Sequence, residues 1–205
     1  MGKEGLASLT GYLLARGGIK SSSAEKLEER LAFLAALLNS GVSDTRGSIS
    51  LNLLSKDLVQ GLAILREVLS ASRFEEDKIA LRKQQILQAM KERNDDSSAI
   101  EDREHDFLAF GENFSTAASI NAITRSDIES FHREWFFPSN CVLAVSGDFD
   151  SREMVQKLES LFADWPFVGQ LPPPIPTNTV FGSSGVYLVN KAVNQGPRSD
   201  NPPRH

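Results

Sequence analysis

The sequence has few of the side chains that build metal sites and covalent crosslinks. Its single cysteine, Cys141, excludes an intramolecular disulfide and any cysteine-based zinc or iron–sulfur site, because each needs at least two thiolates. The three histidines, His105, His132 and His205, are far apart, and none has a second imidazole within one helical turn. The sequence therefore contains no two-histidine metal motif.

Long apolar runs and clustered positive charge are also missing. The longest apolar stretches, such as Leu31–Leu38, are far shorter than the ~20 residues that span a bilayer. The formal net charge is −5 and the basic residues are scattered, which argues against a nucleic acid or an anionic membrane as the main partner. With 40% hydrophobic residues and 14 glycines, the composition is that of a globular domain. We expect no transmembrane segment.

Apolar residues at helical spacing predict helices over most of the chain. The expected helices are residues 5–16, 22–38, 57–69, 75–92, 98–110, 124–137, and a last helix that carries Met154, Leu158 and Leu161. Alternation over 48–53 and short apolar runs at 141–146 and 186–189 predict strands. The fold class expected is α+β, with helices packed on a mostly antiparallel sheet.

Composition also predicts the domain boundaries. Residues 1–168 form one domain, and the proline-rich segment 169–184 is an extended linker. Residues 185–205 are expected to begin a truncated second domain and to end in a frayed tail.

Several phrases, in this order, resemble the pitrilysin/insulinase family of zinc metallopeptidases. The resemblance runs from about Gly5 to Gln195. It is carried by Gly5-Leu6-Ala7, Ile86-Leu87, the segment from Ile123-Thr124 to Phe131, Phe137-Pro138-Ser139-Asn140, Val145-Ser146-Gly147-Asp148, and residues 189–195. It implies an insulinase-like metallopeptidase domain. Such domains have two strands before the first of these phrases, so we expect a sheet that lacks its first strands and exposes an edge for pairing with another chain.

Active members of this family carry the inverted zinc motif H-x-x-E-H directly after the Gly-x-Ala phrase, and a further glutamate ligand on a later helix. Here Ser8 and Tyr12 stand at the two histidine positions, Gly11 at the catalytic glutamate and Ala89 at the later ligand. Arg82 stands where active members often have another acidic group. Serine hydroxyls and tyrosine phenols are poor zinc ligands at neutral pH. We therefore expect no catalytic residue, no metal site and no cofactor, although active relatives hold zinc.

The resemblance implies a role as a non-catalytic homologue. Some family members are two-subunit clamshells, so the chain is expected to pair with a zinc-bearing homologous subunit or with itself and to help enclose a peptide. A degenerate gene fragment or a binding module without any peptidase role is the alternative. An active hydrolase that uses His105 or His132 ranks last. The family implies a bacterial envelope or an organelle as the compartment, and the sequence itself leaves the compartment open.

Other marked residues have plain structural interpretations beside the functional ones. Ser8, Gly11 and Tyr12 share one helix face, which is either a repacked former active site or, preferably, a helix-packing surface. Glu101 and His105 are four residues apart, but their acidic neighbours favour a solvated helix face over a metal site.

Three further residues have simple expected places. His132 is expected at the surface, and Cys141 is expected to be a small buried hydrophobe. Asp150 is expected to cap the last helix.

Overall fold

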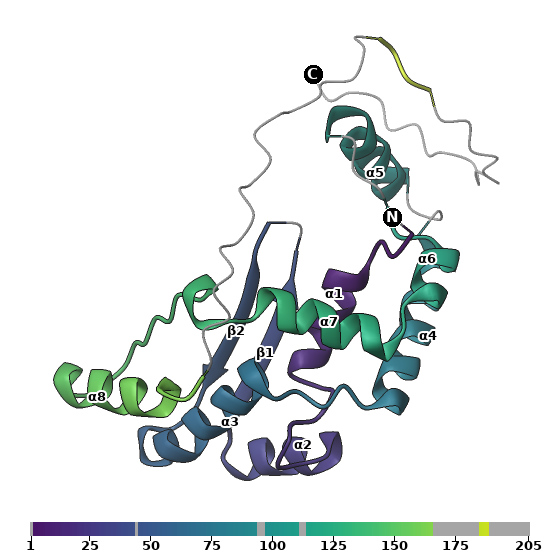
Figure 1. Cartoon of the computed structure of the whole chain (residues 1–205). Helices are drawn as coiled ribbons and strands as arrows, with labels where there is room; N and C mark the ends of the chain where they lie inside the picture. Colours follow the sequence, from purple (N-terminus) through teal and green to yellow (C-terminus); the bar gives the residue numbers. More distant parts are fainter. Residues whose placement is uncertain (1, 44, 94–96, 111–113, 166–184, 189–205) are drawn as a thin grey trace, which may run out of the picture.

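The structure is a computed structural model that describes residues 2–43, 45–93, 97–110, 114–165 and 185–188. Within them the chain is α+β and mostly helical (Figure 1). The elements are α1 (Leu6–Leu14), α2 (Ala24–Phe33), β1 (Leu37–Val42), β2 (Gly47–Asn52), α3 (Leu58–Ser70), α4 (Glu76–Glu92), α5 (Ser97–Phe110), α6 (Ala117–Ala122), α7 (Arg125–Trp135) and α8 (Ser151–Phe162), with 3-10 turns at Ser55–Asp57 and Pro138–Asn140.

Helix α1 lies at the centre of the fold. It packs on β1, on α4 and on α7, which crosses it in Figure 1. Leu9, Leu13 and Leu14 are completely buried, and each contributes about 2 kcal/mol of transfer free energy. The helix begins at Gly5, whose φ of 96° suits a residue without a side chain. This central position places Gly11 against β1 and Tyr12 against α4.

The sheet described is a single antiparallel hairpin. β1 pairs with β2 in a register that places Leu38 opposite Leu51. This confirms the strand predicted at 48–53. We predicted a mostly antiparallel sheet, and within the described residues that sheet consists of two antiparallel strands.

The helix predicted over 22–38 is wrong in its second half. The helix ends at Phe33, and the chain enters β1 at Leu37. Ala35 has a φ of 47°, in the left-handed region, which a right-handed helix cannot continue through. Leu38 fits the apolar stripe of a helix, but it is buried from the strand instead.

Two other predicted strands are also wrong. Residues 141–146 follow the 3-10 turn without joining a sheet, and Val142 is 99% exposed. Cys141 is exposed rather than buried. Residues 185–188 are likewise not in a strand, and 189 lies outside the described residues. A strand needs ladder hydrogen bonds to a neighbour, and within the described ranges neither segment has one.

The other predicted helices are confirmed within one to three residues, because their start signals are local. Thr124 and Asp127 form a capping box at α7. The six-residue α6 is the one described helix that the sequence reasoning missed; it is too short for an apolar stripe, although Thr116 and Ser119 form a capping box there. Within the described part of the chain, no helix is both long and apolar enough to cross a membrane. The predicted linker 169–184 lies outside the described residues, so the domain boundaries stay a prediction.

Asp150 caps α8 as predicted, and removing its side chain should lower the free energy of unfolding. Its Oδ1 accepts hydrogen bonds from the backbone N–H groups of Arg152 and Glu153, both at 2.9 Å. We expect Asp150→Ala to lower the free energy of unfolding by about 1 kcal/mol in urea titrations followed by circular dichroism. Asp148→Ala removes the same charge without touching the cap and should change stability little. Equal losses in the two variants would contradict the capping role.

Candidate functional site

The four positions that the family resemblance assigns to the zinc motif lie on two helices that pack together, α1 and α4. Ser8 is exposed, Gly11 is buried and Tyr12 is half-buried on α1. Ala89 is exposed on α4. The structure joins the two helices directly at this place, because the Arg82 guanidinium of α4 lies over the Tyr12 ring.

Gly11 marks a close approach between α1 and the backbone of β1. A Cβ atom at this position would lie 2.3 Å from the Val42 backbone nitrogen, far inside normal contact distance. Ser40 fastens the two elements: its hydroxyl donates to the Gly11 carbonyl at 2.6 Å and accepts from the Ala15 N–H at 3.0 Å. This is the arrangement that the packing-surface interpretation expects at Gly11. The backbone of β1 thus occupies the space that a side chain here would need.

Tyr12 is flanked by two arginines. The guanidinium carbon of Arg82 lies 3.9 Å from the ring centroid, and that of Arg16, just past the end of α1, lies 4.6 Å from it. Both are cation–π contacts. Arg82 also donates from Nη1 to Oε1 of Gln85 at 3.2 Å. Its Nε is buried and has no hydrogen-bond partner. Sequence reasoning marked Arg82 but missed Arg16, although its i+4 spacing from Tyr12 was a usable signal.

This donor set does not fit a zinc ion. Gly11 and Ala89 offer no ligand atom, and the exposed Ser8 hydroxyl is a weak one. The Tyr12 ring lies beside two permanent positive charges, which repel a dication. Nor do the described residues elsewhere contain three or more His, Cys, Asp or Glu side chains placed to hold a metal.

Glu101 and His105 lie on α5, on an exposed face of the helix, as expected for a solvated acidic face. The His105 side chain is 67% exposed, and its Nδ1 lies 3.4 Å from the Asp106 carboxylate. Glu101 is also exposed.

His132 is half-buried between two aromatic rings, which corrects the prediction of a plain surface imidazole. Its ring stacks on Phe136, with centroids 5.0 Å apart, and meets the Phe74 ring edge-on at 5.4 Å. Burial lowers the pKa of His132 to about 4, against the opposing effect of the Leu69 and Val68 carbonyls. The spacing of Ile128, His132 and Phe136 at i, i+4 and i+8 was the signal for a buried imidazole.

Comparison with known proteins gives one matching family model and several relatives. The model described as "Peptidase M16 inactive domain" matches residues 122–197. A probable mitochondrial-processing peptidase subunit beta from Arabidopsis thaliana is 24% identical over 151 residues, covering 71% of this chain and 28% of the relative. An uncharacterized zinc protease from Mycobacterium leprae is 28% identical over 155 residues, covering 70% of this chain and 34% of the relative.

The crystal structure of a protease from Helicobacter pylori has the same fold. It aligns with a TM-score of 0.74 at 19% identity, covering 86% of this chain and 44% of the other. The Arabidopsis thaliana and Mycobacterium leprae relatives are much longer than this chain, which spans about a third of the length of each. The family-model match begins after α1 and α4, so it does not bear on Ser8, Gly11, Tyr12 or Ala89.

Proposed function

Because this chain is a partial-length homologue of the pitrilysin/insulinase-like (M16) peptidases, we propose that it is a non-catalytic partner that helps a zinc-bearing homologue to enclose a peptide. The observation that carries this proposal is the contact of two arginines with Tyr12, at a position where the family resemblance implies a zinc-binding histidine in active members. Peptide hydrolysis by this family needs a metal-bound water, and these residues supply no ligand for the metal.

The partner role is supported by the kind of relatives the chain has. One is named as a subunit of a processing peptidase, and another as a zinc protease. An M16-type fold without metal ligands still offers the surface of one half of such an enclosure. The zinc, the general base and the bond cleavage would then all belong to the partner half.

Hydrolysis measurements on reconstituted proteins test this role. The full chain alone should cleave no fluorogenic peptide in a chelator-sensitive way. Affinity capture from its own cells should recover a homologue with an intact H-x-x-E-H, identified by mass spectrometry. Adding the chain to that homologue should raise its hydrolysis rate, compared with the homologue alone. Chelator-sensitive cleavage by the repurified chain alone would overturn the non-catalytic assignment, and the absence of any effect on the homologue would overturn the partner role.

A further inference from the structure

The two arginines at Tyr12 are not neutralised by carboxylates. Their guanidinium carbons both lie within 4.6 Å of one ring centroid. Within the described ranges, no ion pair joins either arginine to an acidic side chain, although the chain carries 27 Asp and Glu. In contrast, Arg66 and Arg125 have carboxylate partners at 3.0 Å and 2.8 Å. In a protein with a net charge of −5, two guanidinium groups without a carboxylate partner thus meet at one ring.

Such a pair is costly to hold together in the absence of an anion. Two like charges that share a half-buried ring repel each other through a medium less polar than water. The cation–π contacts repay part of this cost and fix the direction of each guanidinium. The Arg82 Nε–H is buried and has no acceptor, so the terminal guanidinium nitrogens are the groups of Arg82 that can meet a ligand. A bound anion would relieve the repulsion between the two arginines.

We propose that Arg16, Arg82 and Tyr12 form a binding site for a carboxylate of the enclosed peptide. The inference rests on the proposed function and names the ligand chemistry of the same site. Guanidinium groups present planar, paired donors that match a carboxylate. The positive charge that zinc supplies in active relatives is here supplied by arginines, which attract an acidic peptide without activating water.

The surroundings of the site leave a route for a ligand. Ser8 is exposed on α1 before Tyr12, and Arg16 is exposed just past the end of that helix. On α4, Gln85 and Ala89 are exposed and lie on about the same face as Arg82. Ser8, Gln85 and Ala89 carry no charge, so none of these three neighbours repels a peptide carboxylate.

Fluorescence anisotropy with matched peptides tests the site. The probes are two labelled decapeptides with blocked ends, identical except for one central Glu or Gln. We expect the full chain to bind the Glu peptide about tenfold more tightly, because a charge-assisted hydrogen bond is worth roughly that factor. Arg16→Gln and Arg82→Gln should each remove most of the difference, and Tyr12→Phe should retain it because the ring remains.

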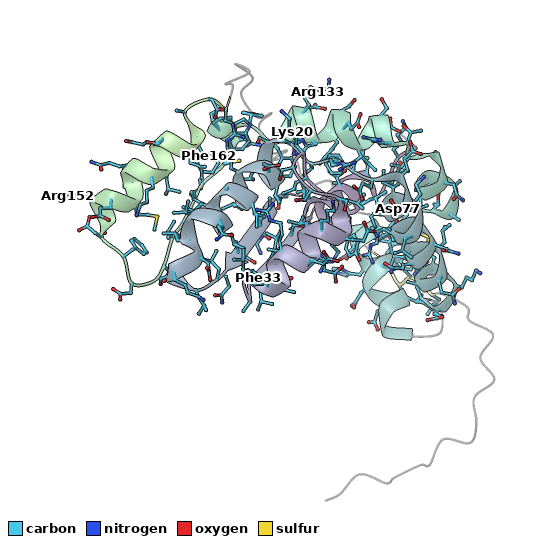
Figure 2. The ribbon with its side chains drawn as sticks, turned by 90° about the horizontal axis from the view of Figure 1, so that it is seen from below. Lys20, Phe33, Asp77, Arg133, Arg152 and Phe162 are labelled. Atoms are coloured by element: carbon cyan, nitrogen blue, oxygen red, sulfur yellow. The ribbon has the colours of Figure 1, made fainter. Side chains whose placement is uncertain are left out.

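The control is an arginine of equal charge far from the site. Arg152 is exposed at the start of α8, and Figure 2 shows it at the opposite end of the molecule from Asp77 at the start of α4. Arg152→Gln should bind both peptides as the unchanged chain does. Circular dichroism melting would show that each variant is folded, so that a loss of binding reports on the site.

Defined outcomes would overturn the inference. Equal affinity for the Glu and Gln peptides would do so, as would a preference that persists in the Arg16→Gln, Arg82→Gln double variant. Inorganic phosphate that binds more tightly than the Glu peptide would overturn the assignment to a peptide carboxylate. These binding assays involve neither zinc nor a partner. Their failure is therefore distinct from a failure of the non-catalytic role, which the hydrolysis assays measure.

Discussion

Replacing Gly11 with alanine is expected to lower the free energy of unfolding by up to about 2 kcal/mol. The added Cβ would lie 2.3 Å from the Val42 backbone nitrogen, and a strand backbone cannot rotate away as a flexible side chain can. Overpacking of this kind costs about 1–3 kcal/mol and outweighs the ~1 kcal/mol that alanine gains in helix propensity. The shift would also strain the Ser40 hydrogen bonds to α1.

Urea unfolding followed by circular dichroism measures this effect, and Gly41 provides the matched control. Gly41 lies on β1, beside the contact, and a Cβ there meets nothing within 4 Å. Gly41→Ala should therefore leave stability nearly unchanged. A Gly11→Ala chain as stable as the Gly41→Ala chain would contradict the close approach of α1 and β1. Gly11→Glu, which places a glutamate where the family resemblance predicts the catalytic one, should be destabilised further because its side chain is larger.

Acid is expected to destabilise the fold through His132, by about 3 kcal/mol between pH 6.5 and pH 4. Burial lowers the pKa of folded His132 to about 4, whereas the unfolded chain keeps a pKa of about 6.5. Between these two values the unfolded chain binds a proton that the folded chain does not. Stability is therefore fully present above pH 6.5 and is lost as the pH falls toward 4.

Chemical unfolding at a series of pH values measures this slope. His132→Phe keeps an aromatic ring against Phe136 and Phe74, and it should flatten the slope in this window. His105→Phe, at an exposed histidine, should retain the slope of the unchanged chain. The Lys3 ammonium and Thr124 lower the pKa of Asp127 to about 2, so its stabilisation is lost only below about pH 4, outside this window. An unchanged slope in His132→Phe would assign the acid sensitivity to other groups.

The sequence predicts those parts of the fold that depend on neighbouring residues. The capping box of α7 and the alternation of β2 are local patterns, and the structure confirms both elements. The end of α2 depends on Ala35 in the left-handed region, where no glycine marks the turn. The apolar run at 141–146 satisfies strand composition, but pairing with another strand is a property of the whole fold.

The candidate site also has parts that the sequence predicts and parts that depend on tertiary packing. Motif spacing identified Tyr12, Ala89 and Arg82, because helix positions follow from sequence alone. The sequence predicted a packing surface at Gly11 but not its partner, since the start of β1, Leu37 and Leu38, was expected to be the end of a helix. Burial of His132 depends on Phe74, which is far away in sequence and reaches the ring through tertiary packing.

Zinc content tests the non-catalytic assignment most directly. The full chain is dialysed against equimolar zinc, freed of unbound metal and measured by inductively coupled plasma mass spectrometry, beside a homologue with an intact H-x-x-E-H. A chain whose motif positions hold Ser8, Gly11, Tyr12 and Ala89 should retain no stoichiometric zinc, while the homologue retains one ion per chain. One zinc ion per chain in this protein, lost in a Tyr12→Phe variant, would contradict the assignment.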